Sequence, residues 1–331
     1  MHIPRLLVFD LDGTLLNDDK RIPQESVDEI NRLYKEYGII PVISTARPLE
    51  IAKLVAEQGG EAFAHSHIIA TNGAIVYDVA KGEYLLKKSL SHTALGQLIY
   101  MCKEHNLEFE IMTDEKEIAQ VQYKYRRAED PIYTNAGKEF AFETDLGEYI
   151  HNLPEGSVPL FAISGSNTEL KDIQEKLDAI PGISRTVPNS RGEGLEYYDV
   201  MPQGVSKSEA LELISNILEI EPEAIFTFGD GGNDIPMLTH GRQYKLEDKS
   251  VSERNRIHCE KGVFSIAPAN AKDDVKAVVD FTTPETNNSG AIANFLKALR
   301  IHLETYYKQK VAGEPTIDDK SKPTMAEGQE L

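Results

Sequence analysis

The first part of the chain alternates between two hydrophobic patterns. Short apolar runs without helical spacing, which suit buried strands of a parallel sheet, are separated by longer stretches with apolar residues on one helical face. The strands are expected at 6–9, 39–44 and 67–70, and the helices at 23–37 and 48–58. This alternation predicts an α/β fold with a Rossmann-like, doubly wound and mostly parallel sheet.

The pattern changes between residues 87 and 190. The turn sequence Thr71-Asn72-Gly73 and a hairpin over 74–77 and 84–86 close the first part. Strands are then expected at 108–112, 158–164 and 183–187, and helices at 93–105 and 170–180. The mixed order of these elements predicts an inserted α+β domain.

After residue 190 the first pattern returns. Strands are expected at 195–200, 224–228 and 262–267, and helices at 209–218 and 291–307. We therefore expect a discontinuous first domain, residues 1–86 and 191–310, interrupted by a second domain at 87–190. The segment 311–331 mixes Pro, Gly and charged residues with few large apolar ones, so we expect it to be disordered.

The composition describes a globular chain with an acidic balance. Its 331 residues are 40% hydrophobic and carry a formal net charge of −19, which argues against nucleic acid as a partner. No apolar stretch reaches membrane length, and the N-terminus has no signal-peptide pattern. The two cysteines, Cys102 and Cys259, lack metal-ligand spacing. We expect a cytoplasmic protein without a membrane partner, and the sequence does not predict its oligomeric state.

Polar residues gather where three of the expected strands end and where one helix begins. Ligands of open α/β sheets sit outside the carboxyl ends of the strands, so these residues are expected to meet in space. They are Asp10 and Asp12, Thr45 and Arg47, the group Asp230, Asn233 and Asp234, and Lys207. Each alone also fits a local role, such as a turn, a helix cap or a surface charge.

Together these residues favour chemistry on a phosphoryl group. The carboxylates are hard oxygen ligands of the kind that Mg²⁺ prefers, while Thr45, Arg47 and Lys207 offer donors and positive charge to a phosphoryl group. One carboxylate can act as nucleophile, giving an aspartyl-phosphate, and a second can move a proton. The chain lacks the GxxxxGK[ST] loop, so nucleotide-dependent transfer through that motif is not supported.

The motifs closely resemble those of the haloacid-dehalogenase superfamily of phosphohydrolases. The DxDGT motif of that superfamily stands here as Asp10-Leu11-Asp12-Gly13-Thr14. The segments STARP, NGA, GVSKSEAL and GDGGNDIPML resemble its Cof-type subfamily, which has a large C2-type cap. The resemblance extends over about residues 5–299. It implies that the inserted domain is a cap, which closes over the site, excludes water and selects the substrate.

The resemblance also implies a role for each carboxylate. Asp10 is the nucleophile, and Asp12 is the acid and base that protonates the leaving oxygen and then activates water. Mg²⁺ is held by the side chains of Asp10 and Asp230 and by the backbone carbonyl of Asp12. Asp234 either supports the metal or holds Lys207.

The phosphoryl-binding residues follow from the same resemblance. Thr45, Lys207 and Asn233 hold the transferring phosphoryl group, with Arg47 and Asn72 nearby. Asp10, Asp12, Thr45 and Lys207 thus form the expected catalytic set. The expected partner is a small phosphorylated metabolite.

Two segments depart from the pattern of the family. They are residues 262–271, which follow a long polar stretch at 241–261, and residues 287–290. They leave the rim of the pocket and the substrate unassigned. The leading prediction is a Mg²⁺-dependent phosphatase for a small metabolite such as a sugar phosphate. The alternatives are a phosphomutase of the same superfamily and a binding module without activity, although a binding module has no need of paired acids at positions 10 and 12.

Overall fold

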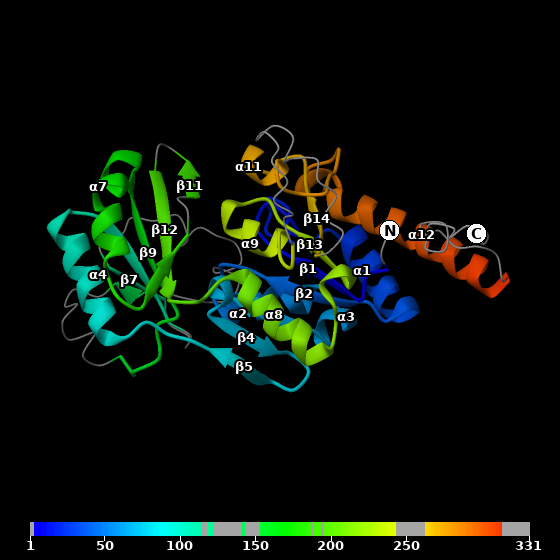
Figure 1. The fold of residues 1–331 in the computed structure, drawn as a ribbon, viewed down its shortest axis with the longest axis horizontal. Helices are drawn as coiled ribbons and strands as arrows, with labels where there is room; N and C mark the ends of the chain where they lie inside the picture. Colours follow the sequence, from blue (N-terminus) through cyan, green and yellow to red (C-terminus); the bar gives the residue numbers. More distant parts are fainter. Residues whose placement is uncertain are drawn as a thin grey trace, which may run out of the picture.

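The computed structural model of the chain contains two β-sheets with their helices (Figure 1). It describes residues 3–113, 118–121, 141–142, 153–186, 189–192, 195–242 and 262–312. Cys259, most of the polar stretch 241–261 and residues 313–331 lie outside these described residues. The expectations that concern them therefore stay predictions.

The larger sheet is mostly parallel. Among the described residues it has eight strands in the order β15-β14-β13-β1-β2-β3-β4-β5. Neighbours from β15 to β3 are parallel, and β4 and β5 form an antiparallel edge. The strands are β1 (Leu6–Phe9), β2 (Ile40–Ser44), β3 (His67–Ala70), β4 (Ile75–Asp78), β5 (Glu83–Lys87), β13 (Ile225–Phe228), β14 (Phe264–Ala267) and β15 (Phe281–Thr282). The expected fold class is confirmed, and only the short β15 has no counterpart in the sequence analysis.

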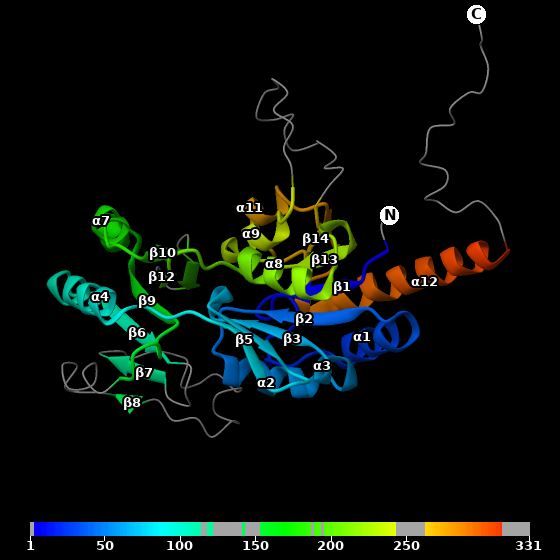
Figure 2. The ribbon, with the colours of Figure 1, turned by 60° about the horizontal axis from the view of Figure 1, so that its bottom comes forward.

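Helices cover both faces of this sheet (Figure 2). One face packs against α1 (Gln24–Tyr37), α2 (Leu49–Gln58), α3 (Glu61–Ala64) and α12 (Ala291–Ala312). The other face packs against α8 (Lys207–Leu218) and α9 (Ile235–Leu238), with α11 (Asp273–Lys276) beside α9. The molecule therefore has the three-layer arrangement in which ligands bind at the carboxyl ends of the strands.

The first strand explains why polar residues appear where they do. Leu7 and Phe9 pack against the α1 side of the sheet, and Leu6 and Val8 pack against the α8 side. A strand covered on both faces needs apolar residues throughout, so the first polar side chain after Leu6 is Asp10, beyond the carboxyl end of the strand.

The turn after β1 depends on a glycine. Gly13 has φ +79°, and a Cβ atom at this position would lie 2.4 Å from Oδ2 of Asp230. Both the left-handed backbone and the close approach of a second loop therefore exclude larger side chains. This contact brings the loop after β1 against the loop after β13.

The smaller sheet is mostly antiparallel, in the order β10-β12-β9-β6-β7-β8 with β11 beside β12. Its strands are β6 (Glu108–Met112), β7 (Ile118–Val121), β8 (Ala141–Phe142), β9 (Leu160–Ser166), β10 (Ile183–Arg185), β11 (Asn189–Gly192) and β12 (Leu195–Pro202). One face carries Phe109, Phe161 and Tyr198, which pack under α4 (His92–Glu104) and α7 (Asn167–Asp178). This is the α+β mixture expected for the middle of the chain.

One strand belongs to a different sheet from the one expected. The strand expected at 195–200 in the first domain is β12, which pairs with β9, β10 and β11 in the smaller sheet. The placement in the first domain is therefore wrong for this strand. Its alternating pattern indicates a strand but carries no information on its partner, because register and pairing are set by long-range packing.

The last described helix is longer than expected. α12 continues to Ala312, so the prediction of disorder from residue 311 is wrong for Val311 and Ala312. These two residues are exposed and lie more than two turns beyond Leu303, the last buried residue of the helix. Within the described residues, no helix combines the length and the apolar character needed to cross a membrane.

The second face of the smaller sheet lies against the larger unit. Met112, Leu160 and Met201 of this face form one apolar cluster with Ala74 and Val205, which follow β3 and β12. The smaller sheet therefore has one face under its own helices and one face toward the ends of the parallel strands.

Candidate active site

Lys207 lies at the centre of the candidate site. It is the first residue of α8 and only 1% of its surface is exposed. Its Nζ donates hydrogen bonds to Oδ1 of Asp10 at 2.6 Å, to Oδ1 of Asp234 at 2.6 Å and to the carbonyl oxygen of Ser44 at 2.9 Å. Burial disfavours the ammonium ion, but the two carboxylates outweigh burial and raise the pKa of Lys207. Lys207 is therefore charged, and its three N–H groups match three acceptors.

Three carboxylates form a cluster around this lysine. Asp10, Asp230 and Asp234 each bring one oxygen within 4.8 Å of the others. Burial, followed by the charge of Asp234, raises the pKa of Asp10 well above its usual range and that of Asp230 to about 7. The hydroxyl of Thr14 donates to Oδ1 of Asp230 at 2.7 Å and partly offsets this rise. The cluster is thus strained by like charge, as expected for a site that binds a cation.

Asp234 has structural contacts on both of its oxygens. Oδ1 accepts from Lys207, and Oδ2 accepts from the backbone N–H groups of Asp230 and Gly231 at 3.0 and 2.9 Å. It thereby fixes the glycine turn after β13 and connects it to α8. Of the two roles expected for Asp234, the structure contains the contact to Lys207.

Asp12 has a different environment from the cluster. Nε and Nη2 of Arg47 donate to its two oxygens at 2.6 and 2.7 Å, and Nζ of Lys20 donates at 2.7 Å. Burial alone would raise the pKa of Asp12, but the two cations outweigh it and lower the pKa far below its usual range. The two acids of the DxDGT motif are therefore separated: Asp10 faces the cluster, and Asp12 is held ionised by two cations.

Two backbone loops next to these acids support each other. The N–H of Asn72 donates to the carbonyl of Thr45 at 3.0 Å, and the N–H of Thr71 donates to the carbonyl of Arg47 at 3.0 Å. Oγ of Thr45, which is buried, accepts from the N–H of Arg47 at 3.1 Å. The hydroxyl proton of Thr45 can therefore be donated elsewhere. The loops after β2 and β3 are therefore held together by these backbone hydrogen bonds.

A row of hydrogen-bonded side chains crosses from the larger unit to the smaller sheet. Nδ2 of Asn233 donates to Oδ1 of Asn72 at 3.1 Å, and Nδ2 of Asn72 donates to Oδ2 of Asp199 at 2.8 Å. Asp199 belongs to β12 and is buried. The predicted residues Asn72 and Asn233 are thus joined directly, and the smaller sheet contributes to the same row.

The two segments that depart from the family pattern support the loop after β1. Nδ2 of Asn270 donates to the carbonyl of Gly13 at 2.8 Å, and Nδ2 of Asn287 donates to that of Leu16 at 2.9 Å. The N–H of Asn287 donates to Oδ1 of Asn270 at 2.9 Å, which joins the two segments. The two segments therefore contact the loop that follows Asp10 and Asp12, and they replace none of the carboxylates.

All the predicted site residues lie in this one region. Lys207 is ion-paired with Asp10 and Asp234, and Asp230 lies in the same carboxylate cluster. Asp12 and Arg47 form a second ion pair, and Asn72 and Asn233 are hydrogen-bonded to each other. Thr45 lies in the loop that supports Asn72 and Arg47. Their roles in catalysis remain proposals.

The sequence analysis missed Lys20 and Asp199. Lys20 has φ +58° and lies in the polar turn after the DxDGT motif, so a basic residue in that turn was an available signal. Asp199 is one acid within the strand sequence LEYYDVMP, and nothing in that pattern indicates the contact with Asn72.

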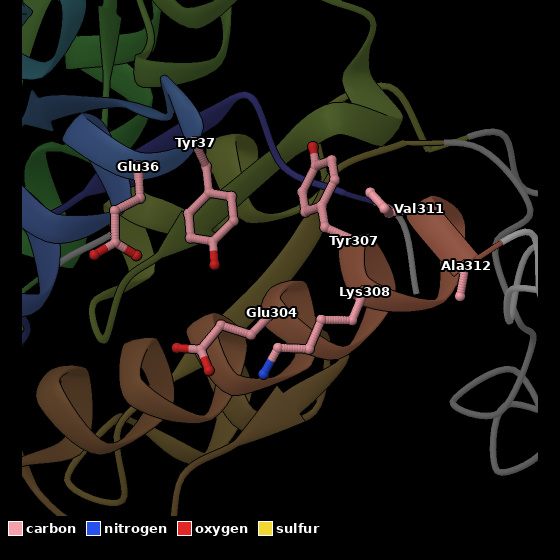
Figure 3. A pocket seen from close by; sticks show the side chains of 7 residues that line it. All are labelled: Glu36, Tyr37, Glu304, Tyr307, Lys308, Val311 and Ala312. Atoms are coloured by element: carbon pink, nitrogen blue, oxygen red, sulfur yellow. The ribbon is translucent and has the colours of Figure 1, made fainter.

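A separate hollow is lined by residues of α1 and α12 (Figure 3). Its lining includes Tyr37 and Tyr307, whose rings stack with centroids 5.6 Å apart. It lies at the C-terminal ends of these two helices and contains none of the predicted site residues. We assign no part of the chemistry to it.

Comparison with known proteins gives the family. Residues 7–244 match the model of the haloacid dehalogenase-like hydrolase family, and the chain belongs to this family. The chain is 26% identical to the 5-amino-6-(5-phospho-D-ribitylamino)uracil phosphatase YitU of Bacillus subtilis, over 89% of this chain and 97% of that protein. It is 25% identical to the HMP-PP phosphatase of Enterobacter sp. strain 638, over 71% and 80%. The prediction of a phosphoric monoester hydrolase of this superfamily is confirmed.

Solved structures show the same fold. A sugar phosphatase of HAD subclass IIB has a TM-score of 0.69 at 22% identity, covering 90% of this chain and 99% of its own. A haloacid dehalogenase-like hydrolase from Bacteroides thetaiotaomicron also has a TM-score of 0.69, at 20% identity, covering 89% and 99%. At these identities the likeness is one of fold, including both sheets.

Proposed function

We propose that this protein is a Mg²⁺-dependent phosphatase that hydrolyses a small phosphorylated metabolite through an aspartyl-phosphate on Asp10. The observation that carries the proposal is the buried group in which Lys207 bonds Asp10 and Asp234 beside Asp230. A nucleophile, an acid–base residue and phosphoryl-binding donors all lie near it. Phosphoryl transfer needs mainly such positioning and charge neutralisation.

The carboxylate cluster fits Mg²⁺. This ion prefers oxygen ligands and keeps several waters, so two or three carboxylates suffice to hold it. Asp10 and Asp230 would bind it with their side chains and Asp12 with its backbone carbonyl, while Asp234 keeps Lys207 and the glycine turn in place. Burial and, after it, the charge of Asp234 raise the pKa values of Asp10 and Asp230, so a cation at this position would favour their ionised forms. When bound, the ion neutralises charge on the phosphoryl oxygens and on the attacking carboxylate.

The first half-reaction belongs to Asp10. A carboxylate oxygen of Asp10 attacks phosphorus, the bond from phosphorus to the leaving oxygen breaks, and that oxygen takes a proton from Asp12. Lys207 fixes the carboxylate of Asp10 in one orientation because it also bonds Asp234 and the backbone of Ser44. Thr45 and Asn233 supply donors to the phosphoryl oxygens.

The second half-reaction returns the proton to Asp12. Asp12 takes a proton from water, the hydroxide attacks the phosphorus of the aspartyl-phosphate, and phosphate leaves with the carboxylate of Asp10 restored. Asp12 must therefore hold a proton when substrate is bound, although Arg47 and Lys20 keep it ionised without substrate. A phosphate dianion next to these cations draws them toward its own oxygens, which raises the pKa of Asp12.

The smaller sheet and its helices are proposed to be the cap. We retain the division into a discontinuous first domain and an inserted one, with β12 counted in the inserted one. The relatives named above act, by their names, on a phosphoribitylamino-uracil and on HMP-PP, and a structural neighbour is a sugar phosphatase. We infer a substrate of this size, a small organic phosphate that fits between the two sheets.

The test is phosphate release from a panel of phosphorylated metabolites with Mg²⁺ present. The purified chain is expected to release phosphate from at least one monoester, and the same chain carrying Asp10→Asn is expected to release none. Isomer formation without phosphate release would identify a phosphomutase instead. Binding of a metabolite without either reaction would contradict both enzymatic functions.

A further inference from the structure

In the row Asn233–Asn72–Asp199 each hydrogen bond has a defined donor and acceptor, which we call the polarity of the row. A carboxylate only accepts hydrogen bonds, so Asn72 must turn its amide nitrogen toward Asp199, and the distance of 2.8 Å shows this bond. The amide oxygen of Asn72 then faces Asn233, whose nitrogen donates to it at 3.1 Å. Because an amide nitrogen has two hydrogens, Asn233 retains a second N–H for another acceptor.

Without an acceptor at position 199 this polarity would not be specified. The terminal torsion of asparagine is broad and roughly two-fold, so the amide of Asn72 can turn over with little cost of its own. Asn72 would then present nitrogen to nitrogen at Asn233, and Asn233 would have to move or turn as well. The charge at Asp199 therefore selects the orientation of both amides.

The rest of the loop holds Asn72 at a fixed point. Thr71 and Asn72 have φ of +48° and +54°, and Gly73 has φ +102°, so three consecutive residues are left-handed. A Cβ atom on Gly73 would lie 2.2 Å from the carbonyl oxygen of Ser206, immediately before Lys207. The loop thus touches the start of α8 as well as the backbone of Thr45. Such strain persists only where the surroundings determine the backbone completely.

Asp199 is itself held by the smaller sheet. Its N–H donates to Oγ1 of Thr186 at 3.0 Å, its carbonyl accepts from the N–H of Thr186 at 2.9 Å, and it lies opposite Ala162 in the ladder. Its carboxylate therefore moves with the smaller sheet, whereas Asn72 and Asn233 belong to the larger unit.

We propose that Asp199 is a positioning residue of the smaller sheet, which orients the amide of Asn233 toward the phosphoryl group through Asn72. The proposal rests on the proposed function in that Asn233 is taken to bind phosphoryl oxygens. Phosphate is then bound well only when β12 occupies the position seen here. Substrate binding and the placement of the smaller sheet are coupled by this row.

The first test removes the acceptor. Asp199→Ala is expected to weaken the binding of inorganic phosphate, measured by calorimetry with Mg²⁺ present, about tenfold, as for loss of one hydrogen bond to a charged group. KM for p-nitrophenyl phosphate is expected to rise by the same factor, with kcat changed less. Asp199→Asn keeps an acceptor for Asn72 but adds a donor, so both orientations of Asn72 become possible and phosphate affinity should fall only about twofold. Ser184→Ala, which removes a bond to the carbonyl of Pro202 in the same sheet, is the matched control and should leave both constants unchanged.

The second test exchanges the partners. Asn72→Asp sets two carboxylates against each other, so it should weaken phosphate binding at least as much as Asp199→Ala. Adding Asp199→Asn to that variant restores one donor and one acceptor, and phosphate affinity should return to within about threefold of the parent. A purely structural role would lower the melting temperature of these variants without this rescue.

The outcomes separate the two proposals. If Asp199→Ala folds and binds phosphate within twofold of the parent, or if the exchanged pair shows no recovery, the positioning role is wrong. If Asp199→Ala does not fold, the proposal is tested by the phosphate affinities of Asn72→Asp and of the double variant with Asp199→Asn. If the parent binds phosphate but hydrolyses no monoester, the proposed function fails while the affinities still test the row. If the parent protein binds no phosphate, both the proposed function and the positioning role of Asp199 are wrong.

Discussion

The two sheets of this protein place their polar side chains in different ways. In the larger sheet the parallel strands are covered on both faces, so polar groups collect beyond their carboxyl ends, as Asp10 does after β1. Within the part of the chain that the structure describes, the smaller, mostly antiparallel sheet has its helices on one face, and its other face lies against the larger unit, where Asp199 reaches Asn72. In the larger sheet the candidate site residues could be predicted from the ends of strands. In the smaller sheet the residue to which we assign a positioning role, Asp199, lies within a strand and was identified only from its contacts.

The largest effect is expected from the nucleophile in the larger unit. Asp10→Asn should lower kcat by at least about a hundred-thousandfold, because an amide cannot form the acyl-phosphate. The measurement is steady-state phosphate release, with Asp18→Asn, in the exposed turn after the motif, as the matched control. Activity like that of the parent would remove Asp10 from its assigned role.

The buried lysine should matter for stability as well as for activity. Lys207→Met leaves Asp10 and Asp234 buried without their cation, so the free energy of unfolding is expected to fall by about 3–5 kcal/mol. Urea denaturation measures this, and Lys171→Met, at an exposed position of α7 over the smaller sheet, should change stability little. Equal losses in the two variants would show that the larger unit does not depend on this ion-paired group.

The acid–base residue should give an intermediate loss. Asp12→Asn is expected to lower kcat about a hundred- to ten-thousandfold, since general acid–base catalysis contributes that much. Rapid-quench measurements should detect a phosphoenzyme that forms and decays slowly. Unchanged rates of formation and decay would contradict the role of Asp12, whatever the result for Asp10.

The stability of the larger unit should depend on both bound metal and pH. Because the pKa values of Asp10 and Asp230 are raised above 3.8, these two carboxylates bind more protons in the metal-free folded chain than in the unfolded chain up to about pH 7. Their contribution to the free energy of unfolding therefore falls as pH rises through this window, whereas His67 and His240, whose pKa values burial lowers, contribute in the opposite direction. Mg²⁺ binds the ionised carboxylates, so it should raise Tm more at about pH 7.5 than at about pH 5.5. EDTA should abolish activity and Mg²⁺ restore it; a Tm gain that is the same at both pH values would contradict the metal site.

The smallest effect tests the two faces of the smaller sheet. Leu160 and Phe161 are adjacent in β9, but Leu160 lies toward the larger unit and Phe161 lies under α4 and α7. Each of Leu160→Val and Phe161→Leu should lower the free energy of unfolding by about 1 kcal/mol. Only Leu160→Val should also change KM. A KM change in both variants would show that the two faces are not distinct in function.

Much of the larger unit could be predicted from the sequence because its signals are local. An apolar run followed by Asp-Leu-Asp-Gly-Thr places the acids at a strand end, and Gly-Val-Ser-Lys places Lys207 at a helix start. The carboxyl ends of parallel strands meet at one edge, so residues far apart in sequence are expected to meet there.

What could not be predicted depends on contacts between distant segments. The sheet to which β12 belongs, the ion pair of Lys20 with Asp12 and the bond of Asp199 to Asn72 are all set by packing across the fold. Lys20 also needs a left-handed backbone, which sequence patterns do not indicate for lysine. The substrate could not be predicted either, because under the proposed function the smaller sheet would select it by shape.

The acids around Lys207 define a charge balance. With all three carboxylates ionised, their charges against one ammonium leave two negative charges, which one divalent ion cancels, and the neighbouring group of Asp12, Arg47 and Lys20 has one positive charge in excess. At a pH where Asp10 and Asp230 are ionised, adding the ion changes the net charge of the pocket from negative to positive. Under the proposed function, a chain with a net charge of −19 would in this way attract a doubly charged anion once its cation is bound. The proposed function therefore predicts an order of binding in which the metal precedes phosphate.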